Sequence, residues 1–441
     1  MPDDFDMDGL YFRLAVSSHE EITALVEDAL MGSGTEAGSD WRPLPDDVTF
    51  GANVLWTWGR PKAEEWSRLV AWQKINHFPN TSYLTRKDML KRAMQKYTRM
   101  GGRVAQVFDI TPLTYVLPSE YVTFVEHFSK LGAKSKKTNL WIMKPAGLSR
   151  GRGIFLFNDI SQVVHGEPVV VQKYIANPLL LHGRKFDLRI YALVTSFEPL
   201  EAFVYKEGFA RVSTVEYDDA PDTLGNNVMH LTNTSIQSVA DTSYTGSDDT
   251  TEWGGSKCSL KFLAKALAEQ GISYSTIWKR ICSVVLKTLY VAKDSIESHP
   301  NSFEVFGFDI MFDADLRAWL IEVNSSPSMA CDNPLDSRIK GSMVADTLKL
   351  VNPLRYDRDA LSSVLSSMIA QKYRHASKDQ LNQDIYDILR GGVPRPPTSG
   401  LPSYLGLYHP IAPSPAFSKL DAIVSRSRKS APSSTSSPKF R

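Results

Sequence analysis

Residues 303–328 read FEVFGFDIMFDADLRAWLIEVNSSPS, and the rest of the chain is interpreted from this stretch. Two apolar runs, at 303–312 and 318–323, are joined by the polar residues 313–315, a pattern that predicts a β-hairpin with a short turn. Alternate side chains of a strand share a face. Asp309 is therefore expected on the face opposite to an apolar row made of Phe306, Phe308, Ile310 and Phe312.

The same hairpin is predicted to gather oxygen donors. Glu322 and Asn324 are two residues apart on the return strand and share a face, so with Asp309 they offer two carboxylates and an amide oxygen to one small space. Such donors suit Mg²⁺, and the lack of an accompanying Cys or His argues against zinc. The alternative is an ordinary hairpin with solvated acids. Burial of an unpaired carboxylate inside a hydrophobic strand is costly, which favours the metal site.

Length and composition indicate a globular protein of two or three lobes. The chain has 441 residues, 42% of them hydrophobic, and a net charge of +1, which argues for neither a nucleic-acid nor a membrane partner. Its three cysteines fit neither a disulfide framework nor a zinc motif, so a reducing compartment is expected. The acidic start, MPDDFDMDGL, is unlike a signal peptide, and no apolar run reaches the length of a membrane span. We therefore expect an intracellular protein that is not inserted in a membrane.

Residues 84–100 have the composition of a basic helix, with Thr85 as the expected cap and Gly101-Gly102 as the stop. Between positions 86 and 103 one acid, Asp88, stands against seven basic residues: Arg86, Lys87, Lys91, Arg92, Lys96, Arg99 and Arg103. The helix could simply expose a solvated face. The alternative is a local binding surface for an acidic partner.

Two further segments suggest phosphate binding. Lys144-Pro145 ends a predicted strand and is followed by AGLSRGRGIFLF, whose glycines would let backbone N–H groups approach phosphate oxygens. This turn alone is a weak signal, and it is neither a P-loop nor a Rossmann fingerprint. In residues 185–189, KFDLR, the charged side chains of Lys185, Asp187 and Arg189 recur every second position and so share one face of a strand. An edge strand with salt bridges would give the same pattern.

The ordered motifs together resemble a known family. They are NHFPNTSYLTRKD at 76–88, Lys144-Pro145 with its glycine turn, QKYI at 172–175, GRKFDLRIY at 183–191, HLTN at 230–233, GFDIM at 307–311 and EVNSSPS at 322–328. Over roughly residues 50–350 the chain resembles the tubulin tyrosine ligase-like family of ATP-grasp amino-acid ligases. It resembles the tubulin polyglutamylase branch more closely.

The resemblance implies an α/β (α+β) ATP-grasp fold with three lobes and a nucleotide held between two sheets. We expect an N-terminal lobe with the basic helix at 1–105, a central lobe at 106–200 and a C-terminal ATP-grasp lobe with the metal hairpin at 201–392. Residues 393–441 are rich in Pro and Ser and basic near the end, which predicts a disordered tail.

The chemistry that the resemblance implies uses ATP and Mg²⁺. ATP would phosphorylate an acceptor carboxylate, and the amine of free L-glutamate would attack the acyl phosphate to form an amide. The acceptor would be the γ-carboxylate of a glutamate in the acidic C-terminal tail of tubulin. The expected setting is the cytoplasm and cytoskeleton, at the axoneme or basal body of a cilium or flagellum, and accessory subunits are compatible with the resemblance.

Residue roles carried over from the family are as follows. Asp309, Glu322 and Asn324 resemble the Mg²⁺ ligands, and Glu322, Arg189 and Arg211 are the expected catalytic residues. Arg189 would neutralise phosphate or acyl-phosphate charge, Arg211 would grip the carboxylate of the incoming amino acid, and Lys87 would face the acceptor or amino acid. The expected nucleotide-binding residues are Lys144, Arg150, Gly151, Gln172, Lys173, Tyr174, Ile175, Lys185, Phe186, Asp187, Thr232 and Asn233. One departure is Gly151-Arg152-Gly153, where the family often has Gly-Lys-Gly, although the charge is preserved.

Three alternatives stay open at this point. A glycine ligase of the same family would differ by a few pocket residues that motifs do not assign. A microtubule-binding protein without catalysis would be expected to lack some of the metal or phosphate positions, all of which hold competent residues here. A metal-dependent phosphohydrolase could use Asp309 and Glu322 but would not need the QKYI strand.

Overall fold

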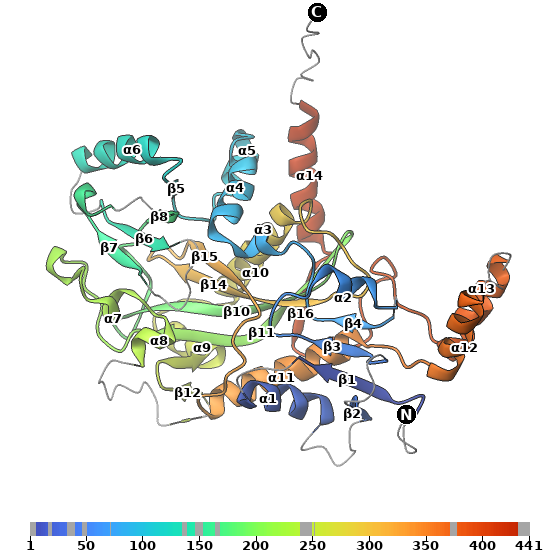
Figure 1. The fold of residues 1–441 in the computed structure, drawn as a ribbon. Helices are drawn as coiled ribbons and strands as arrows, with labels where there is room; N and C mark the ends of the chain where they lie inside the picture. The colour runs from blue at the N-terminus through green and yellow to red at the C-terminus, as the bar shows by residue number, and fades with distance from the viewer. Residues whose placement is uncertain are drawn as a thin grey trace, which may run out of the picture.

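The computed structural model describes residues 6–15, 20–32, 40–45, 51–70, 72–134, 139–145, 153–163, 168–238, 249–250, 252–370 and 377–430. These residues form three sheets with helices packed around them (Figure 1), which confirms the predicted α/β class. The α-helices are α1 (Glu20–Met31), α2 (Ala63–Ser67), α3 (Ser82–Thr85), α4 (Lys87–Thr98), α5 (Gly102–Val107), α6 (Tyr121–Lys134), α7 (Asn227–His230), α8 (Thr234–Gln237), α9 (Leu260–Glu269), α10 (Tyr274–Ala292), α11 (Pro334–Val351), α12 (Arg358–Ile369), α13 (Lys378–Ile388) and α14 (Pro415–Ser430). No helix in these ranges is both long and apolar enough to span a bilayer.

The largest sheet has eight strands in the order β12-β13-β11-β10-β14-β15, with β16 paired to β11 and β9 paired to β10. Its strands are β9 (Leu180–Leu181), β10 (Arg184–Phe197), β11 (Leu200–Val212), β12 (Trp253–Gly254), β13 (Lys257–Ser259), β14 (Glu304–Phe312), β15 (Ala318–Ser325) and β16 (Tyr408–Ala412). Every pairing within it is antiparallel. The predicted hairpin is thus confirmed as β14 and β15.

The two faces of this sheet are buried against different partners. Phe306, Phe308 and Ile310 belong to a core that also contains buried residues of α10, including Ile281 and Leu289. On the opposite face, apolar residues of β10, β11 and β14 pack against α11 and the N-terminal sheet. On β10, Asp187 and Arg189 lie on the same face as the apolar residues Tyr191 and Leu193, nearer to the start of the strand. The face therefore changes from apolar to charged where the cover of α11 ends.

Two smaller sheets complete the fold. The N-terminal sheet is parallel, in the order β2-β1-β3-β4, and its strands are β1 (Leu10–Leu14), β2 (Trp41–Pro43), β3 (Val54–Trp56) and β4 (Lys74–Ile75). The other is antiparallel, in the order β5-β8-β6-β7, and its strands are β5 (Thr114–Leu117), β6 (Trp141–Pro145), β7 (Phe155–Phe157) and β8 (Val169–Lys173). Helix α6 covers one face of this second sheet through Phe124, which packs against Trp141 and Phe157. The uncovered side of the sheet is left to form a cavity wall.

The basic helix differs from the prediction at its start. The structure has two helices, α3 and α4, separated by Arg86, whose backbone is extended at φ −83° and ψ 127°. Thr85 does not cap a helix, because its hydroxyl donates to the carbonyl oxygen of Thr81. The break lets Leu84 of α3 and the α4 residues Leu90, Met94 and Tyr97 all reach the same core. The predicted stop is confirmed, since α4 ends at Thr98 and Gly101 adopts φ +70°.

The prediction of a disordered tail from residue 393 onward is wrong for residues 408–430. Strand β16 pairs with β11, and Leu420 and Val424 of α14 are buried in the core beside α10. Figure 1 shows α14 standing next to α5, and the two helices are in contact. The average composition of the segment hid a helix whose apolar residues recur every three or four positions. Residues 431–441 lie outside the described part of the chain.

The predicted lobe boundary between residues 200 and 201 is also wrong. It falls at the turn between β10 and β11, which are neighbours in one sheet from Phe186 opposite Val212 to Phe197 opposite Leu200. The small antiparallel sheet takes its last strand along the chain from β8, which ends at Lys173. The strands from β9 onward belong to the large sheet. A hairpin cannot be divided between two lobes, because its strands satisfy each other's backbone hydrogen bonds.

Candidate active site

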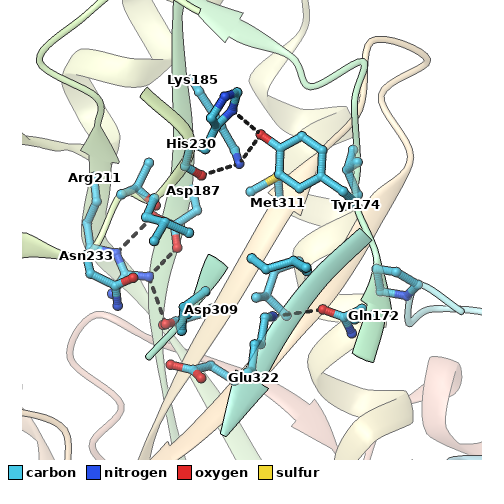
Figure 2. Close-up of a pocket in the computed structure, with 18 of the residues that line it drawn as sticks. Gln172, Tyr174, Lys185, Asp187, Arg211, His230, Asn233, Asp309, Met311 and Glu322 are labelled. Carbon is cyan, nitrogen blue, oxygen red and sulfur yellow. Dashed lines mark hydrogen bonds and ion pairs between the residues drawn. The ribbon is translucent and has the colours of Figure 1, made fainter. Parts of the chain in front are cut away.

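A cavity lies between the small antiparallel sheet and the charged end of the large sheet (Figure 2). The small sheet contributes Ile142, Lys144, Gln172 and Lys173, and the large sheet contributes Lys185, Asp187, Arg211, Asp309, Met311, Ile321, Glu322 and Asn324. Lys87, Ile154, Tyr174, Ile175 and residues 230–233 close its sides. Apolar side chains are thus mixed with many charged ones, as expected for a ligand site.

The register of the large sheet explains why the charged residues meet. Asp187 on β10 is directly opposite Arg211 on β11, and Arg189 is directly opposite Asp309 on β14. Asp309 is in turn opposite Glu322 on β15. Residues paired in this way have neighbouring side chains on the same face. Four strands therefore deliver alternating acids and bases to one end of the sheet.

Asp309 is at the centre of this network. Arg189 Nε donates to its Oδ1 at 2.6 Å, and an Arg211 guanidinium N–H donates to its Oδ2 at 2.7 Å. Arg211 Nε also donates to Asp187 Oδ1 at 2.9 Å. Asp309 is only 2% exposed, and such burial by itself raises a carboxyl pKa, yet the two arginines hold the pKa of Asp309 well below its usual range. The carboxylate therefore stays ionised.

Gly307 makes room for one of these contacts. A Cβ atom at this position would lie 3.2 Å from Cδ of Arg189 and 3.1 Å from Cβ of Pro327. A larger residue would therefore press on the Arg189 side chain where it reaches Asp309. The glycine of the GFDIM motif has a packing reason.

The three residues predicted to bind Mg²⁺ are brought together. Asn324 Nδ2 donates to Glu322 Oε1 at 3.4 Å, and Glu322 Oε2 pairs with Lys87 Nζ at 2.8 Å. Within the described ranges no group of three His, Cys, Asp or Glu side chains is close enough to hold a metal, so the set consists of two carboxylates and one amide. Such a set suits Mg²⁺, which keeps several water and phosphate ligands. Each carboxylate is ion-paired to a cation, and a metal would have to replace part of that pairing.

On the small sheet, Lys144 and Lys173 both have pKa values lowered by burial, and the carboxylate that acts most strongly on Lys144, Glu322, lies on the opposite wall. Lys144 Nζ donates to Gln172 Oε1 at 2.8 Å, and burial lowers the pKa of Lys144 to about 8. Burial likewise lowers the pKa of Lys173 to about 8. Lys173 Nζ also lies 5.1 Å from the centre of the Trp141 ring. This wall therefore holds lysines close to losing their protons.

Lys185 reaches across the cavity from β10. Its Nζ donates to the Tyr174 hydroxyl at 2.8 Å and to the His230 carbonyl oxygen at 2.6 Å, and burial lowers the pKa of Lys185 to about 7. The Tyr174 hydroxyl and His230 Nδ1 are 3.0 Å apart. Burial, and then the nearby Lys185, lower the pKa of His230 to about 4, so this ring is neutral near pH 7. Figure 2 shows the three side chains converging.

Most residues predicted for the site line this cavity, with four exceptions. Phe186 is wrong as a nucleotide contact in this cavity, because it is 1% exposed and packs in the core on the other face of β10. Arg189 lines a neighbouring cavity instead, although it contacts Asp309. Arg150 and Gly151 lie outside the described residues. Sequence reasoning missed His230, whose signal was its place in the HLTN motif, and the apolar contacts Met311 and Ile321.

The neighbouring cavity was not predicted at all. It shares Arg211, Asn233, Glu322 and Asn324 with the first and extends past Phe209 to the start of α11. Its far end is lined by Lys257, Asp332, Asp336 and Lys340. Two of the three predicted Mg²⁺ ligands, Glu322 and Asn324, thus line both cavities.

Two sheets that enclose a cavity lined by lysines and carboxylates are typical of the ATP-grasp class of protein. Residues 65–359 match the tubulin-tyrosine ligase family, and the chain belongs to that family. Membership implies the use of ATP.

Several curated relatives share a more specific name. Tubulin polyglutamylase TTLL5 of Homo sapiens is 38% identical over 307 residues, which are 68% of this chain and 23% of that protein. Probable tubulin polyglutamylase TTLL2 of Homo sapiens is 35% identical over 352 residues, 80% of this chain and 58% of that protein. Tubulin monoglutamylase TTLL4 of Mus musculus is 37% identical over 289 residues, 63% of this chain and 23% of that protein. These relatives confirm the predicted resemblance to the polyglutamylase branch, and the chain spans less than two thirds of their length.

Proposed function

We propose that this protein is an ATP-dependent ligase that adds L-glutamate to the γ-carboxylate of glutamate residues in tubulin C-terminal tails. The observation that carries the proposal is the meeting of Asp309, Glu322 and Asn324 with buried lysines and arginines in a cavity between two sheets. The names of the relatives supply the amino acid and the acceptor.

The reaction requires activation of a poor electrophile. Transfer of the γ-phosphoryl group of ATP to the acceptor carboxylate gives an acyl phosphate and ADP. The glutamate amine then attacks the acyl carbon, an amide forms, and phosphate and a proton leave. Mg²⁺, for which Asp309, Glu322 and Asn324 are the proposed ligands, would stabilise the charge that develops on the phosphoryl oxygens.

The residues of this chain would bind and orient the reactants. Lys144 and Lys185, whose burial lowers their pKa values, would regain full charge beside phosphate oxygens. Gln172, Lys173, Tyr174, Ile175, Thr232 and Asn233 are the proposed nucleotide pocket. Arg189 and Arg211 offer guanidinium N–H groups that are already oriented by carboxylates, which suits them to bind a further acyl phosphate or carboxylate.

The basic surface of α4 and α5 supports an acidic acceptor. Lys87 and Lys91 pair with Glu322 and Glu120, and Arg86 pairs with Asp88. The other four basic residues predicted for this region are exposed: Arg92, Lys96, Arg99 and Arg103. They would attract the acidic tail of tubulin in a salt-dependent way. By the same proposal the protein acts on microtubules of the cytoskeleton, including those of cilia or flagella.

The test is incubation of the purified protein with microtubules, Mg-ATP and labelled glutamate. Glu322→Gln is expected to lower incorporation at least about 100-fold, because a preorganised charge at the reacting phosphate is lost. Asp315→Asn, in the exposed turn of the same hairpin, is the matched control and should keep activity. Incorporation of glycine instead of glutamate would move the protein to the sister activity. Binding of ATP and microtubules without any incorporation would contradict the proposal.

A further inference from the structure

The cavity that was not predicted from the sequence has two lysines, Lys257 and Lys340, and two aspartates, Asp332 and Asp336, at its far end. On β13, Lys257 is directly opposite Arg211 of β11, so the two side chains are neighbours on the same face of the large sheet. Phe209, two residues before Arg211, therefore also shares this face. Two neighbouring cations, Arg211 and Lys257, thus extend from Asp309 into the second cavity, away from the cavity that is proposed to bind the nucleotide.

Lys340 of α11 joins Lys257 at this end. Lys257 Nζ lies 2.6 Å from Asp336 Oδ2, and Lys340 Nζ lies 2.9 Å from Asp336 Oδ1. Both ammonium groups also lie over the Phe209 ring, at 5.6 and 5.7 Å from its centre. Lys340 donates in addition to the carbonyl oxygen of Ala330. One fully buried carboxylate is therefore shared by two buried lysines.

The second carboxylate near Lys257 comes from the surface. Asp332 Oδ2 lies 3.3 Å from Lys257 Nζ, while its side chain is 59% exposed. An ion pair of an exposed carboxylate contributes little to stability, so the pair exchanges readily with another anion. Asp332 shows that Lys257 accepts a second carboxylate from the direction of the cavity. A ligand could take that place while Asp336 stays where it is.

We propose that Lys257 and Lys340 form a subsite for a second carboxylate, next to the Arg211 guanidinium that faces the reaction centre. The proposal rests on the proposed function, in which two acidic reactants must be held. The carboxylate belongs either to the side chain of the incoming glutamate or to an acidic residue beside the acceptor in the tail. A ligand with only one carboxylate would leave this subsite unused, so the lysines would set the preference for an acidic reactant.

The test measures binding to protein saturated with Mg²⁺ and a non-hydrolysable ATP analogue. The probes are L-glutamate, L-glutamine, an acidic tail peptide, and the same peptide with the acids flanking the acceptor changed to Gln. Lys257→Met should weaken binding about 10- to 100-fold for the probe that reaches the subsite, since a charged hydrogen bond is lost. Binding of glutamine, or of the peptide with neutral flanks, should not change. Loss of glutamate binding identifies the incoming amino acid as the source, and loss of peptide binding identifies the acceptor.

Two further variants separate the subsite from a structural role. Asp332→Asn removes the competing surface carboxylate and should tighten the same probe, which loss of a merely structural contact would not do. Lys261→Met is the matched control, because this lysine pairs with Glu252 and its side chain is 62% exposed. If neither Lys257→Met nor Asp332→Asn changes the binding of any acidic probe, the subsite is overturned. Absence of amino-acid incorporation by the wild type would instead overturn the proposed function, because the binding results stand without turnover.

Discussion

The two walls of the cavity between the small and the large sheet carry different kinds of charge. The wall from the large sheet holds Arg189 and Arg211 against Asp187 and Asp309, joined by direct hydrogen bonds. The wall from the small sheet holds Lys144 and Lys173, whose pKa values burial lowers to about 8. Arginine does not lose its proton in a protein, so a buried guanidinium needs acceptors in the free protein, and here these acceptors are the carboxylates of Asp187 and Asp309. A buried lysine can lose its proton, and a bound anion can raise its pKa again so that it regains the charge.

This difference predicts that the large-sheet wall stabilises the fold, whereas the small-sheet wall serves mainly to bind ligand. The network on the large sheet already has its charge compensated in the free protein. By the proposed function, the lysines on the other wall would gain further compensating charge from a bound phosphate group. Substitutions on the two walls should therefore separate stability from affinity.

The largest expected effect is on stability. Arg211→Met should lower the free energy of unfolding by about 3–5 kcal/mol, because it leaves Asp187 and Asp309 buried with part of their pairing lost. Urea denaturation measures the change. Arg338→Met, at a side chain that is 41% exposed, is the control and should shift it by no more than about 0.5 kcal/mol. An Arg211 variant as stable as the control would show that the network is not what stabilises this wall.

The next effect is on affinity. Lys144→Met should weaken ATP binding about 10- to 100-fold, the loss expected for one hydrogen bond to a charged group. Its free energy of unfolding should fall by about 1–3 kcal/mol, less than for Arg211→Met, because the buried Gln172 acceptor that is left without its donor is neutral. Calorimetric titration with ATP measures the affinity, and Lys130→Met on the exposed side of α6 is the control. A large loss of stability with unchanged affinity for ATP would show that Lys144 stabilises the fold and does not bind the ligand.

A smaller effect concerns pH and stability. The pKa of Lys185 is about 7 in the folded protein against an ordinary value of 10.5, so between these values the unfolded chain binds more protons. The contribution of Lys185 to stability should therefore rise with pH, by about 1.4 kcal/mol per unit above pH 7. The stability difference between the wild type and Lys185→Met, measured by denaturation from pH 7 to 9, isolates this contribution. A difference that is constant with pH would mean that Lys185 stays charged when buried.

The smallest effect links the same lysine to the nucleotide. Phosphate charge beside Lys185 should raise its pKa, so ATP binding at pH 8 is expected to take up a proton and to weaken about a few-fold by pH 9. Calorimetry in two buffers of different ionisation enthalpy counts the protons. In Lys185→Met, ATP binding should take up fewer protons, because the protons that Lys185 binds in the wild type are lost. Equal uptake in both proteins would place ATP away from Lys185.

Local periodicity was enough to predict much of the site. The alternation along 303–328 placed Asp309 and the pair Phe306 and Phe308 on different faces of the strand. The structure confirms this, because the two phenylalanines are in the core and Asp309 is paired across the hairpin with Glu322. The same alternation grouped Lys185, Asp187 and Arg189 on one face of the strand, which leaves Phe186 between them on the other face, where it packs in the core. The family resemblance had suggested Phe186 as a nucleotide contact. The direct reading of the strand was the better guide there.

Features that depend on distant segments could not be predicted. The break at Arg86 arises because two short helices must reach one core, and β16 with α14 is ordered by docking on β11 and α10. Composition averages conceal both effects. Tertiary packing overrides local propensity when apolar residues find a surface to bury against.

By itself the sequence determined which side chains share a face of each strand, because the period of two is a property of the extended backbone. It therefore grouped the three predicted Mg²⁺ ligands of the hairpin and the charged side chains of residues 185–189. Only the tertiary structure decided which strands are neighbours, and so that Arg211 bridges Asp187 and Asp309 and stands beside Lys257. The physical reason is that register between strands far apart in the chain is set by burial of both faces of the sheet, which no local pattern records.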